Sequence, residues 1–342
     1  MSNRPSILNV MATAALVASA SMSASAQAQD FYAGKTISIL VSSDAGGGYD
    51  TYSRLLAQYL PKHIPGKPTI VVQNMPGGGG LRVAQQLYSV VDKDGTKIGN
   101  IRASNVLDSI LNIRGGDIDP NKYEWIGDMA SDTDICSFWH TSGVKTIEDL
   151  KNKEVLIGGS GKGGQNYSFP MSINAVLGTK MKIILGYKGM GDRILALERG
   201  EIQGNCGMNA SSLMALHPDL IANGKLVPVL QSGLTPHPSF KNVPLTQSFA
   251  ANDRQKRLLT TIYAQMDIAR TFAFPPGTPK DRVEIIRKAF LAALADPALI
   301  ADAERLKLDL NPRSGEQVAK IIAEMADVPD DLKKEARAAL GE

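Results

Sequence analysis

Three glycine-rich segments are the part of this sequence best suited to hold a small molecule. They are Asp44–Asp50 (DAGGGYD), Asn74–Gly80 (NMPGGGG) and Gly158–Gln165 (GGSGKGGQ), and each follows an apolar, β-branched run. Glycine lets the backbone come close to a ligand, and the free N–H groups at the start of a helix favour an anion. The alternative is that each segment is only a tight turn. Three such segments together indicate an anion site built from backbone groups.

Catalytic and cofactor motifs are not present at their required spacing. Thr51 stands at the third glycine of a dinucleotide fingerprint, and Gly164 and Gln165 stand where a phosphate-binding P-loop needs Lys and Ser or Thr. Lys162 occupies the last glycine position of a GxSxG motif around Ser160. The four histidines show no spacing with a nucleophile, and no Cys/His cluster indicates a metal. We therefore expect no enzyme activity, no cofactor and no metal.

Two pairs of residues leave alternatives open. Cys136 and Cys206 could form a disulfide in an oxidising compartment, or they could be two buried free thiols on separate strands. Asp132 and Asp134 could form a functional carboxylate pair, but we expect them in an exposed turn before a strand.

The elements that must position these residues alternate between strands and helices. The patterns predict strands over residues 36–42, 69–73, 97–101, 135–139, 154–157, 182–185, 204–208, 226–230 and 260–274, and helices over residues 50–60, 81–91, 189–198, 280–295 and 318–325. Such alternation predicts largely parallel sheets with the strand-to-helix loops on one edge. Ligands of open α/β sheets bind outside the carboxyl ends of the strands, where the glycine segments would lie.

Composition and the N-terminal segment predict an exported, folded protein. The 342 residues suffice for roughly two domains, and 37 Lys and Arg against 34 Asp and Glu give a formal charge of +3. Without a dense basic patch, we expect no nucleic-acid partner. Arg4, an apolar run over residues 7–20 and the sequence Ala26-Gln27-Ala28 have the layout of a signal peptide. We expect a signal peptide over residues 1–28, cleaved after Ala28, and a soluble periplasmic protein.

A series of motifs resembles the solute receptors of tripartite tricarboxylate transporters, the Bug-type extracytoplasmic solute-binding proteins. The motifs follow in order as AGGG-Tyr49-Asp50, Asn74-Met75-Pro76-GGGG, Trp125–Gly127 (WIG), Thr146–Leu150 (TIEDL), Tyr187-Lys188-Gly189, Leu197–Gln203 (LERGEIQ) and Phe274–Pro279 (FPPGTP). The resemblance covers nearly the whole mature chain. Asp44 departs from it, because the family commonly has a small apolar residue there. A carboxylate at that position would repel an anionic ligand unless it points away.

The resemblance implies a two-domain α/β clamp of the type II periplasmic-binding-protein class, with the ligand cleft between the domains. Domain 1 would hold residues 30–133 plus 248–342, and domain 2 would hold residues 134–247. It also implies a monomer without enzymatic activity that captures a small carboxylated solute and delivers it to the membrane subunits of a tripartite tricarboxylate-type transporter. The alternative is an exported ligand-sensing protein, or an enzyme that acts on a small polar substrate.

The candidate ligand-binding residues come from the loops at the expected cleft. They are Gly46, Gly47, Gly48, Asp50, Gly78, Gly79, Ser104, Ser160, Gly161, Gln165, Tyr187 and Asn205. We expect backbone N–H groups, hydroxyls and water to hold the carboxylate, because no loop carries an arginine placed to clamp it. Asp50 has two interpretations, as the N-cap of the helix over residues 50–60 or as a direct ligand contact.

Overall fold

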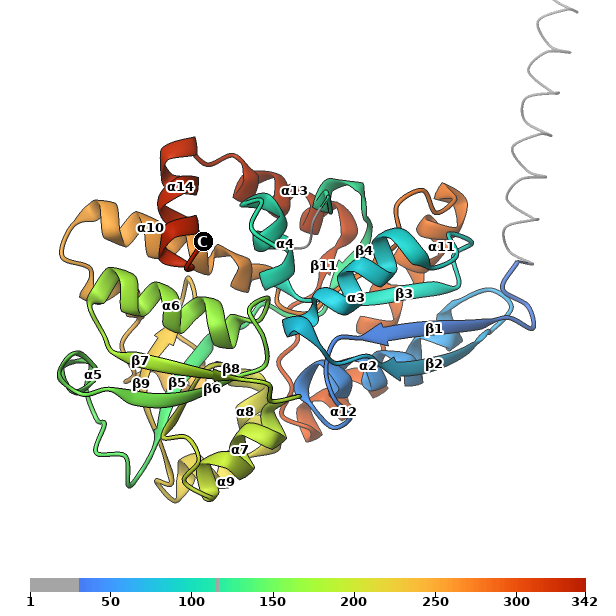
Figure 1. Cartoon of the computed structure of the whole chain (residues 1–342). Coiled ribbons are helices and arrows are strands. Elements are labelled where there is room, and N and C mark those ends of the chain that lie inside the picture. Colours follow the sequence, from blue (N-terminus) through green and yellow to red (C-terminus); the bar gives the residue numbers. More distant parts are fainter. Residues whose placement is uncertain (1–30, 115–116) are drawn as a thin grey trace, which may run out of the picture.

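The computed structural model describes residues 31–114 and 117–342, which form two α/β units side by side (Figure 1). The expected signal peptide lies outside the described residues. The first sheet has the strand order β11 (Arg313–Ser314), β4 (Glu124–Asp128), β10 (Thr271–Phe274), β3 (Lys97–Ile101), β1 (Thr36–Val41) and β2 (Thr69–Asn74). The second has the order β7 (Met181–Leu185), β6 (Val155–Gly159), β8 (Gly204–Asn209), β5 (Asp134–Trp139) and β9 (Leu226–Ser232). The prediction of a two-domain α/β fold is confirmed.

The first unit packs helices on both faces of a mixed sheet. Strand β1 is parallel to β2 and β3, whereas β10 and β11 run antiparallel to their neighbours. Its helices are α2 (Gly48–Tyr59), α3 (Leu81–Gln85), α4 (Ala103–Ile110), α11 (Lys280–Leu294), α12 (Pro297–Arg305) and α13 (Gly315–Ala326). Helix α11 packs against α2 and β4, and buries Phe290 and Val283 completely. Burial of these apolar faces is the main stabilising contribution to this unit.

The second unit repeats this arrangement with a smaller sheet. Strands β6 and β7 are parallel, and β5 runs antiparallel to both β8 and β9. Its helices are α5 (Ile147–Asn152), α6 (Gln165–Leu177), α7 (Met190–Glu198), α8 (Ala210–Leu216) and α9 (Pro218–Ala222). Thr146 and Asp149 form a capping box that defines the start of α5.

The C-terminal segment contributes to both units. Helix α10 (Asp253–Tyr263) and helix α14 (Asp330–Ala339) pack against α6 of the second unit (Figure 1), whereas α11 and α13 pack on the first sheet. The chain therefore links the units by these helices as well as by the crossovers at residues 129–133 and 233–252. The domain bounds expected from the resemblance stay a prediction.

One local prediction is wrong, and one open alternative is decided. The strand expected over residues 260–274 is reduced to β10, because Asn252 caps α10 through the Gln255 N–H and the helix buries Leu259 and Ile262 on one face. Cys136 and Cys206 form a disulfide between the neighbouring strands β5 and β8, so the structure decides between the two alternatives.

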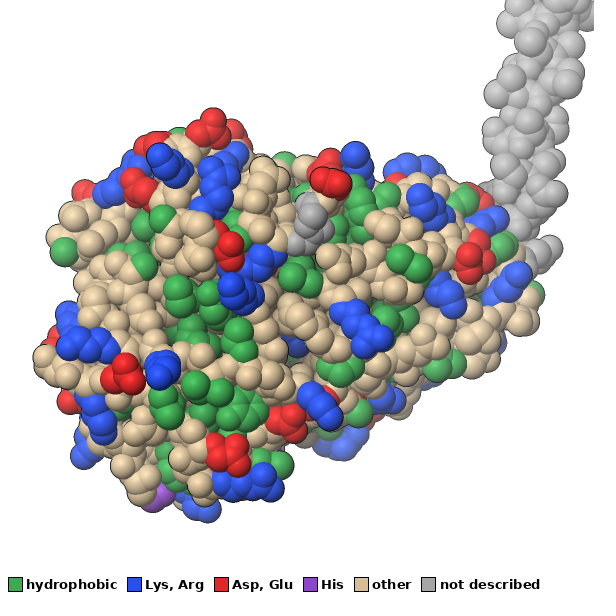
Figure 2. Space-filling view, in the orientation of Figure 1, with side chains coloured by type: hydrophobic (Ala, Val, Ile, Leu, Met, Phe, Trp, Pro, Cys, Tyr) green, Lys and Arg blue, Asp and Glu red, His purple; other side chains and the backbone are tan. Residues whose placement is uncertain are grey.

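The described surface carries both charge signs. Figure 2 shows Lys and Arg side chains interspersed with Asp and Glu over one face. No helix within residues 31–114 and 117–342 has the length and apolar character needed to cross a bilayer.

Candidate functional site

The glycine segments of the two units touch each other. Ser104 Oγ and Asn105 Nδ2 of the first unit donate to the Gly163 carbonyl of the second, at 2.8 and 2.9 Å. A Cβ added at Gly79, whose φ is +68°, would lie 2.2 Å from the Gly164 nitrogen. Side chains larger than glycine would therefore hold the two backbones apart. The need for glycine here comes from contact between the units, in addition to any contact with a ligand.

Two small neighbouring cavities lie where the units meet. One of about 170 Å³ is lined by Ser42, Gly79 and Arg102 of the first unit and by Ser160, Tyr187 and Lys188 of the second. The other, of about 40 Å³, is lined by Asp44, Gly47, Gly48, Tyr49 and Arg102 on one side and by Gln165, Gly189 and Arg193 on the other. Arg102 belongs to both cavities. Their position between two α/β units suits a small molecule, although both volumes lie below the ~300–1,000 Å³ that is typical of ligand pockets.

Two buried arginines give this region its chemistry. Arg102 follows β3, donates from Nε to Ser42 Oγ at 3.1 Å and from Nη2 to the Ser42 carbonyl at 2.9 Å, and stacks on the Tyr49 ring. Arg193 of α7 is 4% exposed, and its buried Nε has no hydrogen-bond partner among the described residues. Burial lowers the pKa of both guanidinium groups, that of Arg193 to about 10.

A buried guanidinium is costly unless an acceptor compensates the lost water. Neither arginine has a carboxylate at ion-pair distance within the described part of the chain, although Asp44 lies on the same cavity. An incoming carboxylate would accept hydrogen bonds from the planar guanidinium groups and supply the missing negative charge. The two arginines therefore make the region between the units chemically suited to an anion. The described residues contain no group of His, Cys, Asp and Glu suited to hold a metal ion.

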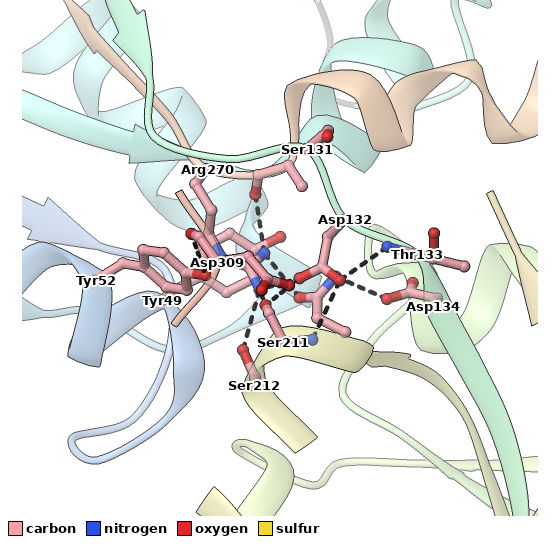
Figure 3. A network of polar contacts seen from close by, with 12 residues as sticks. Tyr49, Tyr52, Ser131, Asp132, Thr133, Asp134, Ser211, Ser212, Arg270 and Asp309 are labelled. Carbon is pink, nitrogen blue, oxygen red and sulfur yellow. Dashed lines mark hydrogen bonds and ion pairs between the residues drawn. The ribbon is translucent and has the colours of Figure 1, made fainter. Parts of the chain in front are cut away.

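A buried ion pair joins the two units beside these cavities (Figure 3). Arg270, directly before β10, donates from Nη2 to Asp132 at 2.8 Å and to Ser212 Oγ at 3.0 Å, and from Nη1 to Asn209 Oδ1 at 2.9 Å. Its guanidinium also stacks on Tyr49 and Tyr52 of α2, with ring centroids 4.9 and 4.8 Å away. Because Asn209 and Ser212 belong to the second unit, Arg270 connects both units to the crossover at Asp132.

The exposed turn expected for Asp132 and Asp134 is wrong. Asp134 is 1% exposed and accepts from Asn209 Nδ2 at 2.7 Å, and the side chain of Asp132 is completely buried against Arg270. The sequence alone places polar residues between two strands, which usually indicates a solvated turn. Here the segment is the crossover between two packed units, and a distant arginine compensates the buried charge.

Asp134 predicts a pH dependence of stability. Burial, assisted by the charge of Asp132, raises the pKa of Asp134 to about 8. The folded chain keeps this proton to about pH 8, whereas the unfolded chain releases it near pH ~4. Folding therefore takes up a proton between these values, and the free energy of unfolding falls as the pH rises through them.

Asp134→Asn removes that titration while retaining an oxygen to accept from Asn209. We expect the variant to gain stability relative to the native chain as the pH rises from about 5 to about 9. Urea unfolding at several pH values measures the difference. A difference that does not change with pH would show that Asp134 is already ionised in the folded chain.

Comparison with known proteins identifies the architecture. The periplasmic binding protein BugD superposes with a TM-score of 0.72 at 19% identity, covering 89% of this chain and 97% of that one. The fold is that of the Bug-type solute-binding proteins. MatC from Rhodopseudomonas palustris, solved with bound malate, superposes with a TM-score of 0.68 at 16% identity, covering 90% of this chain and 99% of that one. Rpa4515 from R. palustris, solved with adipate, superposes with a TM-score of 0.67 at 17% identity, covering 88% of this chain and 97% of that one.

The sequence comparison agrees with the Bug-type fold. A UPF0065 protein in the TAR-I ttuE-ttuC' intergenic region of Agrobacterium vitis is 26% identical over 288 residues, which are 80% of this chain and 76% of that protein. No family model matches the chain. The resemblance derived from the ordered motifs is confirmed.

The candidate residues from the sequence fall into three groups in this Bug-type fold. Gly47, Gly48, Gly79, Ser160, Gln165 and Tyr187 line the two cavities. Gly78, Ser104 and Gly161 lie at the contact between the loops of the two units. Gly46 and Asp50 line a separate surface hollow, and Asn205 is fully buried in β8, where its amide has no hydrogen-bond partner among the described residues. A ligand contact by any of them stays a prediction.

Sequence reasoning missed Arg102 and Arg193, which line the cavities between the units. The expectation that backbone groups, hydroxyls and water hold the carboxylate, without an arginine, stays a prediction. Arg102 stands directly after β3, two residues before the candidate Ser104, so the argument from strand ends could have found it. Arg193 lies within a helix pattern, next to Ile194, which is also buried. An arginine among the apolar residues of a helix face is unusual, and this position could have marked Arg193 as a candidate.

Asp50 fixes the shape of the first glycine segment, although it is not the N-cap. The N-cap of α2 is Gly47. The Asp50 carboxylate accepts from the Gly46 N–H at 2.8 Å, from Arg54 Nε at 2.8 Å and from Asn74 Nδ2 at 2.9 Å. Although burial opposes it, these hydrogen bonds hold the pKa of Asp50 below its usual value. The carboxylate thus ties the first glycine segment to the start of the second.

Replacing Asp50 should reveal this structural role. We expect Asp50→Ala to lower the free energy of unfolding by roughly 1–3 kcal/mol, because the Gly46 N–H loses its acceptor and Asn74 Nδ2 loses one of its two acceptors. Asp50→Asn retains an oxygen and should lose about half as much. Chemical denaturation measures both variants. Unchanged stability, with an equal loss of ligand affinity in both, would instead show that the charge meets the ligand.

Proposed function

We propose that this chain is a periplasmic solute receptor that captures a small carboxylated solute between its two α/β units. It then delivers the solute to the membrane subunits of a tripartite tricarboxylate-type transporter. The fold of the Bug-type solute-binding proteins and the N-terminal sequence, with its signal-peptide layout, support this proposal. The receptor acts as a monomer and performs no chemistry on the solute.

One observation carries the proposal, namely two buried guanidinium groups without carboxylate partners at a cavity between the units. Arg102 is held toward the cavity by Ser42, and Arg193 faces it from the other unit. A solute carboxylate that contacts both would link the units, so ligand binding would favour the closed arrangement. The malate and adipate bound to the two R. palustris proteins have the same chemistry.

A thermal-shift screen of the mature chain with mono-, di- and tricarboxylates tests the function. A ligand present at 100 times its dissociation constant stabilises the folded chain by about 2.7 kcal/mol. We expect at least one carboxylate to raise the melting temperature in a concentration-dependent way, and calorimetry to give a stoichiometry of one. If no carboxylate binds at millimolar concentration, the proposal is wrong.

The contact between the glycine segments gives a second test. A Cβ at Gly161 would lie 2.8 Å from the Gly79 nitrogen. We expect Gly161→Ala to weaken binding of the identified carboxylate by roughly 5-fold or more, because overpacking of this contact costs about 1–3 kcal/mol in the closed form. Gly191→Ala is the control, because nothing lies within 4 Å of its Cβ. Equal affinities of the two variants would contradict a cleft that closes by this contact.

A further inference from the structure

Asp44 introduces a negative charge into the cavity that holds the two arginines. It comes from the first unit, directly after the Ser42-Ser43 pair, and lines the smaller cavity together with Arg102 and Arg193. Its Oδ1 is buried and has no hydrogen-bond partner among the described residues. Arg193 Nε, on the same cavity, is buried and unpartnered as well. The residues that line this cavity therefore include one buried acceptor and one buried donor, of opposite charge, that are both unused.

The position of Asp44 is fixed by the opposite unit. A Cβ added at Gly189 would lie 1.8 Å from Oδ1, so only glycine leaves room for the carboxylate at the N-terminus of α7. Burial raises the pKa of Asp44 and Asp192 adds to this rise, whereas Arg193 and Arg102 lower the pKa. The side chain thus points toward the second unit and does not turn away from the arginines.

We propose that Asp44 makes this cleft select carboxylates that also carry an ammonium group, that is, zwitterionic solutes of the amino-acid type. This inference rests on the proposed function and names the solute class for the same site. The solute carboxylate accepts from Arg193 and Arg102, and its ammonium group donates to Asp44 Oδ1. Both buried groups that lack partners are then satisfied by one ligand.

A carboxylate without an ammonium group fits this cavity less well. It would satisfy the arginines but leave Asp44 buried without a donor, and its own charge would repel the aspartate. A hydroxyl in place of the ammonium group could donate to Asp44 without the attraction of opposite charges. Hydrogen bonds to charged groups are stronger than neutral ones, so the expected order of affinity is amino acid, then hydroxy acid, then the unsubstituted acid.

The test compares triplets that share one carbon skeleton. The probes are aspartate, malate and succinate; glutamate, 2-hydroxyglutarate and glutarate; and alanine, lactate and propionate. Calorimetry with the mature chain should give, in at least one triplet, an amino acid that binds at least ~10-fold tighter than its unsubstituted acid. If the unsubstituted acid binds as tightly as the amino acid in every triplet with measurable binding, the inference is wrong while the proposed function stands. Absence of binding by all nine probes would overturn the inference, and absence of binding in the wider carboxylate screen as well would overturn both.

The variant Asp44→Asn tests whether Asp44 causes the preference for the amino acid. The variant keeps the size of the side chain and removes its charge, so the preference for the amino acid should fall to within about 3-fold, and the unsubstituted acid should bind more tightly than it does to the native chain. Asp219→Asn removes the same charge from an exposed position in α9 and should keep the native preference. A melting temperature close to the native value establishes that both variants are folded. A preference unchanged in Asp44→Asn would overturn the assignment.

Discussion

Arg193→Met is expected to weaken binding of the solute carboxylate by about 30-fold or more. Loss of one partner from a buried, hydrogen-bonded charge pair costs about 2–5 kcal/mol in binding, and each 1.4 kcal/mol is a tenfold change in affinity. Methionine retains much of the apolar stem of arginine, so the packing around α7 is largely kept. Calorimetric titration of the mature chain with the solute identified by the screen measures the loss.

The same variant separates binding from folding. In the absence of solute, the buried Arg193 Nε has no partner among the described residues, so removing the guanidinium should leave the melting temperature unchanged or raise it. Arg199→Met, at the C-terminal end of the same helix α7, is the matched control, because Arg199 is largely exposed and forms a surface ion pair with Glu201 at 3.7 Å. Native affinity in Arg193→Met would contradict the proposed role of this arginine.

Arg270→Met is expected to lower the free energy of unfolding by about 3–5 kcal/mol. The substitution leaves the Asp132 carboxylate buried without its cation, and the Asn209 and Ser212 side chains lose the donor that joins them to the first unit. Urea denaturation followed by circular dichroism measures the loss.

Two further variants show whether the unpaired charge causes this loss. Arg305→Met removes an exposed arginine that pairs with Asp302, and surface pairs of this kind contribute only about 0–1 kcal/mol. Arg270→Met combined with Asp132→Asn removes both charges and should recover part of the stability, because no uncompensated ion remains buried. If Arg270→Met costs as little as Arg305→Met, the ion pair does not hold the units together.

The regular elements and the glycine segments were accessible from the sequence because local patterns encode them. The runs TISILV and TIVVQN are apolar and β-branched and become β1 and β2, and the helix expected over residues 280–295 is α11. The division of these elements between two α/β units was predicted from the family resemblance, and local patterns did not show it. The strand predicted over residues 260–274 is wrong for most of its length, because their β-branched residues belong partly to the buried face of α10.

The charged groups of the site were less accessible, because their meaning depends on contacts far apart in the chain. Arg270 and Asp132 are separated by 138 positions, and Asp44 meets Gly189 of the other unit. Neither pair has a periodic signal. Asp132 and Asp134 therefore resembled a solvated turn, and Arg193 resembled an ordinary helical residue. Only the packing of the two units shows that these charges are buried together.

A crystal structure of the mature chain with its tightest carboxylate tests the central claim most directly. The account predicts one solute molecule between the two units, with its carboxylate within hydrogen-bond distance of Arg193 or Arg102. A cavity of about 670 Å³, lined by Lys256, Arg257, Met325 and their neighbours on α10 and α13, offers an alternative location outside the cleft. A solute bound there, or one between the units that contacts neither arginine, would contradict the account.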